Sequence, residues 1–115
     1  MSELAELHCI RVGADTPRLD PNEISQLKAK LPGWCAFEKD GEPRLEKVFK
    51  FENFDQAMKF TDQVARTAAA EDHHPAITTE WGKVTVTWWT HKIKGLHQND
   101  FIMAAKTEQL YGKTA

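Results

Sequence analysis

Two runs of β-branched and aromatic residues, joined by a short turn, limit most strongly what this chain can fold into. The runs cover residues 76–80 and 84–90, and Trp81-Gly82-Lys83 lies between them. Runs of this composition are typical of β-strands, and Gly82 is available for a positive φ at the turn. We therefore expect an antiparallel hairpin in which residues equally distant from Gly82 face each other.

A second hairpin is expected earlier in the chain. Residues 34–39 and 45–51 flank Asp40-Gly41-Glu42-Pro43, a strong turn signal. Leu45, Phe49 and Phe51 share one parity with Lys47, so one face of the second strand is mostly apolar.

Three helices separate and flank these hairpins. A capping box is predicted at the start of the first helix. Asp20 is the cap, Pro21 follows it, and Glu23 is the third helical residue. Asn53 is expected to cap a long second helix, and the third begins around 97–99. The apolar periods that define the inward faces are Ile24, Leu27 and Leu31; then Phe54, Ala57, Met58, Thr61, Val64, Ala65 and Ala68; then Phe101, Ile102, Ala105 and Leu110.

The order helix, hairpin, helix, hairpin, helix predicts an α+β fold. We expect a four-stranded, mainly antiparallel sheet with three helices packed on one face. A chain of 115 residues fits a single domain, residues 1–115. Residues 1–19 show no clear period, and we expect part of this segment to be mobile.

The overall charge and the termini exclude several classes of protein. Fifteen basic and seventeen acidic residues give a net charge of −2, which disfavours a nucleic-acid-binding protein or one that binds an anionic membrane. No apolar run approaches the roughly 20 residues that a membrane-spanning helix needs. The N-terminus lacks the pattern of a signal peptide, so we expect a cytoplasmic protein with Cys9 and Cys35 as reduced thiols.

Three of the five histidines are expected to meet at one end of the second hairpin. If the ladder extends beyond the strands, His73 faces His91 and His74 faces Thr90. Histidine gives and takes protons near neutral pH, and Asp72 and Asp100 lie nearby in the sequence. The chain has no nucleophile motif, phosphate-binding loop or dinucleotide fingerprint. Chemistry that needs only proton transfer therefore fits best.

Two other interpretations of the histidines remain open at this point. The His73-His74 pair before Pro75 can be a polar turn without a chemical role. A zinc site built from the three histidines and an acid is a second alternative. Adjacent residues in an extended chain point to opposite sides, which disfavours a shared ion. Trp88 is expected to be structural, whereas Trp89 shares the parity of His91 and can line a pocket for a flat ring.

The motifs around these histidines resemble those of one known family. Glu71-Asp72-His73-His74-Pro75 is followed by Trp81, Val84, Val86, Thr90-His91, Gly95-Leu96 and Asp100. This pattern closely resembles the pterin-4a-carbinolamine dehydratases over residues 20–111. The resemblance implies elimination of water from 4a-hydroxytetrahydrobiopterin to give the quinonoid dihydropterin. That reaction recycles the cofactor of aromatic amino acid hydroxylases, notably phenylalanine hydroxylase.

The resemblance also implies roles for individual residues. His73 and His91 are expected to be general acids that protonate the departing hydroxyl, and His74 to hold the pterin ring. Beside them we expect substrate-binding residues and supporting residues. The substrate-binding set is Asp72, Thr90 and Trp89 with His74; the supporting set is Glu71 and Asp100. No cofactor or metal is expected, and the resemblance implies a homo-oligomer, a dimer of dimers.

The sequence departs from the family at one position. Many relatives have an acidic or polar residue four positions before the first histidine, where this chain has Ala69. Glu71 or Asp72 can supply that charge. Animal relatives also act as dimerisation cofactors for a transcription factor, so a non-catalytic partner module is the alternative function.

Overall fold

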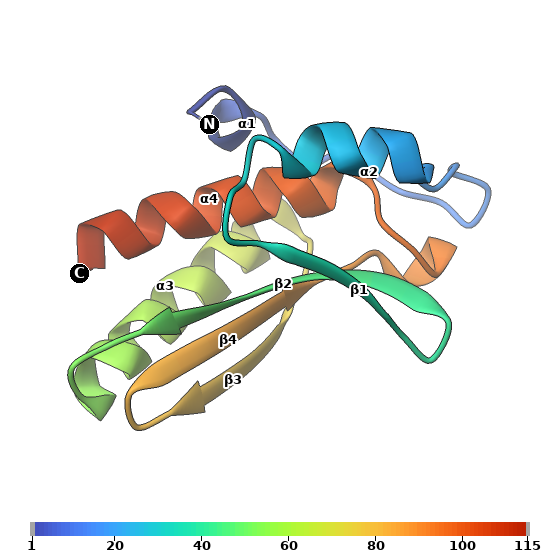
Figure 1. Cartoon of the computed structure of the whole chain (residues 1–115). Helices are drawn as coiled ribbons and strands as arrows, with labels where there is room; N and C mark the ends of the chain where they lie inside the picture. The colour runs from blue at the N-terminus through green and yellow to red at the C-terminus, as the bar shows by residue number, and fades with distance from the viewer. Residues whose placement is uncertain (1, 115) are drawn as a thin grey trace.

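The computed structural model describes residues 2–114, which form one four-stranded sheet with α-helices on one side. Two hairpins build the sheet: β1 (Cys35–Lys39) with β2 (Glu42–Lys50), and β3 (Ala76–Glu80) with β4 (Lys83–Trp88). The strand order is β1-β2-β4-β3, and every neighbouring pair is antiparallel. The predicted α+β architecture is confirmed (Figure 1).

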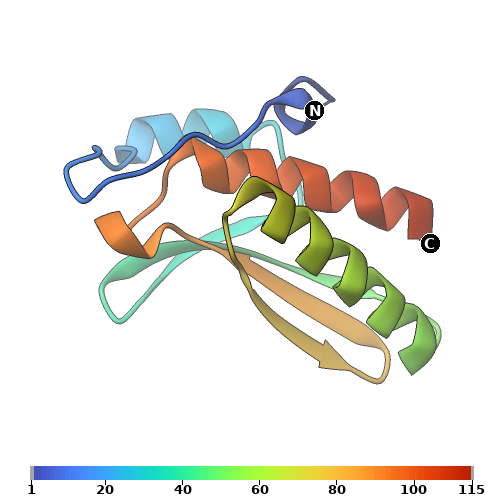
Figure 2. The ribbon, with the colours of Figure 1, turned by 180° about the vertical axis from the view of Figure 1, so that it is seen from behind.

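Four α-helices accompany the sheet, one more than expected. They are α1 (Ser2–Glu6), α2 (Pro21–Lys28), α3 (Phe54–Glu71) and α4 (Gln98–Thr114). Figure 2 shows α3 and α4 lying side by side in front of the sheet. The unexpected α1 has too few residues to show a period, yet it packs on α4 and buries Leu4 and Ala5.

Both predicted helix caps are present. The Asp20 side chain accepts from the Glu23 amide at 2.8 Å, and the Glu23 side chain accepts from the Asp20 amide at 2.9 Å. Asn53 accepts from the Gln56 amide at 2.8 Å. These local signals were readable in the sequence because a cap satisfies amides within its own first turn.

The first hairpin turns more tightly than expected. Only Asp40 and Gly41 lie between the paired residues Lys39 and Glu42, and both have positive φ, 55° and 78°. Such a two-residue turn matches the twist of the strands. Pro43, expected in the turn, belongs to β2 and lies outside its ladder with β4, where its missing N–H is harmless.

The second hairpin differs from the prediction in register. Glu80 pairs with Lys83, so two residues form the turn and the ladder is shifted by one residue. Gly82 does not adopt a positive φ. Instead its carbonyl accepts from the Phe51 amide at 2.9 Å, and a Cβ there would lie 3.4 Å from the Phe51 carbonyl oxygen. Neither a positive φ nor a clash therefore requires glycine at this position.

The buried face of α3 is rotated relative to the predicted one. Phe54, Met58 and Ala65, expected to face inward, are exposed, whereas Phe60 is fully buried. The Phe60 ring packs in an aromatic cluster with Phe49 at 5.0 Å between centroids. The other members of this cluster are Phe51, Tyr111 and, through Phe49, Trp34. The packing of the Phe60 ring against this cluster thus determines which side of α3 is buried.

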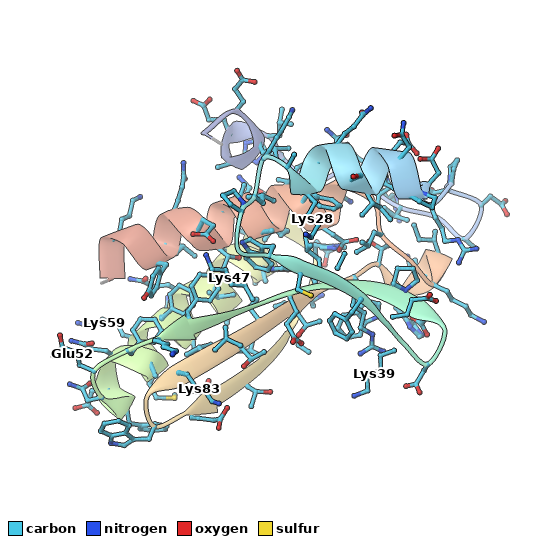
Figure 3. All side chains as sticks on the ribbon, in the orientation of Figure 1. Lys28, Lys39, Lys47, Glu52, Lys59 and Lys83 are labelled. Atoms are coloured by element: carbon cyan, nitrogen blue, oxygen red, sulfur yellow. The ribbon has the colours of Figure 1, made fainter. Side chains whose placement is uncertain are left out.

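One charged residue shares the inner face of the sheet. Lys47 lies between Leu45 and Phe49 on β2, and Figure 3 shows its side chain between the sheet and α4. Its ammonium pairs with Glu108 of α4, which also accepts from the Trp34 indole at 2.9 Å. The apolar stem can therefore stay in the interior while the charge is compensated.

Candidate functional site

A hollow of about 380 Å³ lies where three chain segments meet at one end of the sheet. The segments are the stretch after α1, the stretch between α3 and β3, and the stretch after β4. The lining residues are Arg11, Val12, Asp72, His73, His74, Trp89, Thr90, His91 and Lys92. The structure thus brings together six of the eight residues named from the sequence, and only Glu71 and Asp100 lie outside the lining.

The end of α3 delivers the first two histidines to the hollow. Asp72 ends the helix in the left-handed conformation with φ 52°, and the next amide, of His73, donates to the Ala68 carbonyl at 3.1 Å. An aspartate tolerates this conformation better than most residues. The chain then leaves the helix sharply, with His73 largely buried and His74 exposed.

His73 is held by a buried carboxylate. Its Nε2 lies 2.6 Å from Asp100 Oδ1, and Asp100 is completely buried. Because a carboxylate can only accept, Nε2 donates and Nδ1 remains as the nitrogen for proton exchange. The ring also stacks on Trp88, with centroids 5.9 Å apart and planes 7° from parallel. Orientation and tautomer of His73 are therefore both fixed.

Asp100 is satisfied by two further donors. The Thr90 hydroxyl donates to Oδ2 at 2.8 Å, and the His97 amide donates to the same oxygen at 2.9 Å. Three hydrogen bonds compensate a carboxylate that has no contact with water. Asp100 thus joins the start of α4, the segment after β4 and His73.

The third histidine reaches the hollow by a different route from the predicted one. The β3–β4 ladder ends at Ala76 and Thr87, so it does not carry His91 opposite His73. Instead Thr90 forms a bridge with Gly95, and His91 opens a 3₁₀ turn, His91–Ile93. This 3₁₀ turn changes the direction of the chain after Thr90 and so places His91 at the hollow.

His91 is 79% exposed, unlike His73, and its Nδ1 lies 3.3 Å from Glu42 Oε1 at the start of β2. Glu42 therefore stands next to the hollow. The sequence pattern places Glu42 in the turn of the first hairpin and does not connect it with a histidine 49 residues away.

Trp89 lines the hollow with one ring face already occupied. The Arg44 guanidinium carbon lies 4.0 Å from the Trp89 ring centroid, a cation–π contact. Within residues 2–114, two buried side-chain nitrogens, Arg44 Nε and Trp89 Nε1, have no hydrogen-bond partner. A flat ligand can therefore use only the face of Trp89 that Arg44 leaves open.

Of the two acids that could replace the residue expected at position 69, only Asp72 lines the hollow. Glu71 points instead toward the N-terminal segment, where it accepts from the Cys9 amide at 2.7 Å and pairs with His8 at 2.7 Å. Burial alone would raise the pKa of Glu71. The Cys9 amide, His8 and Lys106 outweigh burial, and the pKa is lowered.

The N-terminal segment brings residues that no sequence pattern indicated. Arg11 and Val12 line the hollow, and the Lys92 ammonium lies 3.5 Å from the Val12 carbonyl. Lys92 also lines an adjoining hollow with Arg18 and Lys94. Arg11 and Lys92 thus bring two basic side chains to the hollow, beside the acidic Asp72.

Cys9 lies near the buried acids, with its Sγ 3.9 Å from the Asn99 carbonyl. Burial raises the pKa of the Cys9 thiol to about 12, and the carboxylates of Glu71 and Asp100 act in the same direction. It stays a thiol at neutral pH, so it is a poor nucleophile.

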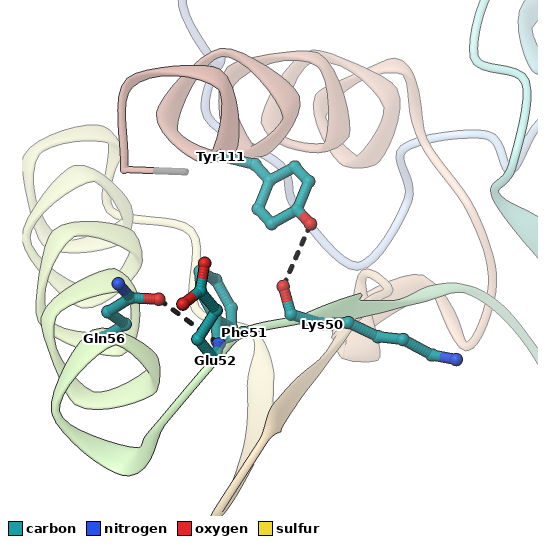
Figure 4. Close-up of a pocket in the computed structure, with 5 residues that line it drawn as sticks. All are labelled: Lys50, Phe51, Glu52, Gln56 and Tyr111. Carbon is teal, nitrogen blue, oxygen red and sulfur yellow. Dashed lines mark hydrogen bonds between the residues drawn. The ribbon is translucent and has the colours of Figure 1, made fainter.

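Another hollow, of about 340 Å³, lies near the C-terminal end of α4 (Figure 4). Its lining consists of Lys50, Phe51, Glu52, Gln56 and Tyr111. The Tyr111 hydroxyl donates to the Lys50 carbonyl at 3.0 Å, and the Glu52 amide donates to Gln56 at 3.3 Å. This hollow has no histidine, and its groups are engaged with one another. The histidine-lined hollow is therefore the candidate site.

No helix within residues 2–114 is long and apolar enough to cross a membrane. Over the same residues, no three His, Cys, Asp or Glu side chains gather where they could hold one metal ion.

The chain is similar in sequence and fold to known proteins. A protein of Microcystis aeruginosa, provisionally named a pterin-4-alpha-carbinolamine dehydratase, is 51% identical over 111 residues, 96% of each chain. A crystal structure from Brucella Melitensis, described as a transcriptional coactivator/pterin dehydratase, superposes with a TM-score of 0.75 at 33% identity. It covers 84% of this chain and 100% of that one.

A more distant structure shares the fold alone. It is a pterin dehydratase-like protein identified as a RuBisCO assembly factor in the alpha-carboxysome, with a TM-score of 0.60 and 24% identity. The match covers 71% of this chain and 93% of that one. The family described as Pterin 4 alpha carbinolamine dehydratase matches residues 17–110. The chain therefore belongs to the pterin-4a-carbinolamine dehydratase family.

Proposed function

We propose that the protein is an active dehydratase that eliminates water from 4a-hydroxytetrahydrobiopterin to give quinonoid dihydropterin. In this reaction the bond between carbon 4a and the hydroxyl oxygen breaks, and the oxygen leaves as water after gaining a proton. The neighbouring ring nitrogen loses its proton and completes the elimination. Hydroxide is a poor leaving group, so the reaction gains most from a positioned acid.

The observation that carries this proposal is the placement of three histidines around one hollow, with one of them fixed by Asp100. With Nε2 bound to Asp100, His73 delivers its proton from Nδ1. Asp100 holds the ring in place from the far side. A positioned general acid of this kind contributes about 10²–10⁴-fold to a rate.

His91 is the second acid in this proposal. Its Nδ1 faces Glu42, so Nε2 is available to the substrate. His73 and His91 come from different segments, so we propose that each serves one face of the pterin ring. The 4a carbon is a stereocentre, and its hydroxyl can project from either face.

The remaining lining residues bind the substrate in this proposal. His74 and Asp72 are exposed beside His73 and supply polar contacts to the ring. Trp89 offers its open face to the flat ring. Thr90 acts mainly through Asp100, because its hydroxyl hydrogen is already donated there. Glu71 supports the site from outside the hollow by holding the N-terminal segment.

A stopped-flow assay of 4a-hydroxytetrahydrobiopterin dehydration tests the proposal directly. The purified chain should accelerate the absorbance change of quinonoid dihydropterin formation in proportion to enzyme concentration. A chain that is folded but gives only the uncatalysed rate would refute the enzymatic proposal. We further propose that the product returns to a cytoplasmic aromatic amino acid hydroxylase, such as phenylalanine hydroxylase. The active form is proposed to be a homotetramer.

A non-catalytic partner module is the second candidate function. The Brucella Melitensis relative, 33% identical, is described as a transcriptional coactivator as well as a pterin dehydratase. A pure adaptor has no chemical need for a fixed His73–Asp100 pair, which favours the enzyme. If His73→Ala abolished turnover but left partner binding intact, both functions would share the fold.

A further inference from the structure

The first turn of α4 is capped by a histidine. His97 precedes the helix, and its Nδ1 accepts from the Asn99 amide at 3.0 Å. In return the His97 amide donates to Asp100 Oδ2 at 2.9 Å. This reciprocal pattern resembles a capping box, except that His97 accepts from the second helical amide and not the third. Serine, threonine, aspartate or asparagine usually occupies the capping position. His97 is buried, so water cannot replace it easily as the acceptor.

The cap and the candidate site share one carboxylate. Asp100 Oδ2 closes the capping box, and Asp100 Oδ1 binds His73 Nε2 at 2.6 Å. Asp100 is the third residue of α4, so its position follows the geometry of the first helical turn. A first turn that loosens therefore moves Asp100 relative to His73. One hydrogen-bonded network therefore joins the cap of α4 to His73, the proposed general acid.

This cap works in one protonation state of His97. Nδ1 can accept from the Asn99 amide only while it carries no proton, so the ring is neutral with its proton on Nε2. The titratable groups whose charges act on the ring are Asp100 on α4 and His73 on the segment after α3. Burial lowers the pKa of His97, His73 adds to this effect, and the Asp100 carboxylate opposes it.

We propose that His97 is a positioning residue whose neutral ring caps α4, holds Asp100 and thereby fixes His73. Protonation of His97 releases the Asn99 amide and loosens the carboxylate that sets the His73 tautomer. This inference rests on the proposed dehydratase function for its effect on turnover. Its structural part, the coupling of His97 to the His73 tautomer, stands independently of any activity.

Three variants separate positioning from simple stabilisation. His97→Ala removes the acceptor, and His97→Ser supplies an oxygen that can cap the same amide. Asn53→Ala is the matched control, because it removes the cap of α3, which lies away from the hollow. Loss of either cap should lower the folding equilibrium constant about fivefold. Only His97→Ala should also lower kcat, by about tenfold with KM nearly unchanged, and His97→Ser should restore most of it.

The pH dependence of folding gives a second readout of the histidine cap, because a serine in its place does not titrate. The unfolded chain takes up a proton on His97 near its ordinary pKa of 6.5, whereas the native chain resists it. The stabilisation is therefore complete above pH 6.5 and declines as pH falls from there toward the lowered native pKa. In that window the folding constant of wild type should fall relative to His97→Ser by up to about tenfold per pH unit.

Imidazole ¹⁵N chemical shifts of His73 decide the matter without a turnover assay. In wild type and His97→Ser the proton should reside on Nε2, whereas His97→Ala should show a mixture of tautomers. If wild type has no dehydratase activity, the shifts and the pH dependence still test the coupling. If His97→Ala does not fold, the comparison of wild type with His97→Ser carries the test. Unchanged shifts and kcat in a folded His97→Ala, or identical pH dependence of wild type and His97→Ser, would overturn the proposal.

Discussion

Replacement of Asp100 by asparagine is the sharpest test of the proposed acid. The side chain keeps its size but loses its charge and one of its two acceptor oxygens. The remaining oxygen can still serve the Thr90 hydroxyl and the His97 amide, which converge on Oδ2. The new amide group then faces His73 Nε2, donor against donor. His73 must move its proton to Nδ1 so that Nε2 can accept from the new amide.

The size of the effect follows from the bond that is lost. A hydrogen bond to a charged group contributes about 1.5–3 kcal/mol. The bond holds the His73 ring in position for proton transfer, so its loss should lower kcat by about 10- to 150-fold while KM changes little. The stopped-flow dehydration assay measures both constants, and ¹⁵N shifts of His73 report the tautomer.

Glu108→Gln is the matched control for the loss of a carboxylate on the same helix. Glu108 accepts from Trp34 and pairs with Lys47, away from the hollow. This variant should lose stability but keep kcat. An Asp100→Asn protein that is folded and turns over at the wild-type rate would show that Asp100 does not set the state of His73.

Four other outcomes are expected. His73→Ala and His91→Ala should each lower the rate by one or two orders of magnitude, unequally for the two 4a epimers, and the double variant should lose nearly all catalysis. Steady-state kinetics of His74→Ala should show a raised KM more than a lowered kcat. Urea titrations should show that Glu71 adds to the free energy of unfolding. This contribution should be complete above the ordinary pKa of 4.5 and should decline as pH falls through the lowered native pKa. The Glu71→Gln variant should lack it. Sedimentation at micromolar concentration should give a species larger than the 13.1 kDa chain, because edge strand β3 (Ala76–Glu80) leaves backbone groups unpaired.

The parts of the fold that the sequence predicted are those decided by short-range chemistry. Asp20 and Asn53 cap amides in their own first turns, and Asp40-Gly41 marks the position of the first hairpin turn, although not its length of two residues. The buried face of α3 depended instead on long-range packing. Periodicity allowed two adjacent stripes, and the aromatic cluster around Phe60 selected the one that leaves Met58 exposed.

Six of the nine residues that line the hollow were predicted from the sequence, and Arg11, Val12 and Lys92 were not. Hairpin geometry grouped His73 with His91, although the actual ladder stops before either residue and a 3₁₀ turn completes the approach. No sequence pattern indicated that Arg11, Glu42 and Lys92 would lie at or near the hollow. Each reaches the hollow, or a histidine beside it, through contacts between segments that lie far apart in the sequence.

His73 and His91 differ in how firmly the structure holds their rings. His73 is the one that the fold immobilises, because Asp100 and Trp88 hold its ring from two sides. His91 is exposed and meets Glu42 at 3.3 Å, so its ring keeps more freedom. A fixed acid favours one geometry of the departing hydroxyl, whereas a freer acid tolerates several. We therefore expect the epimer served by His73 to react with the larger kcat, and its rate to depend more strongly on the integrity of the first turn of α4.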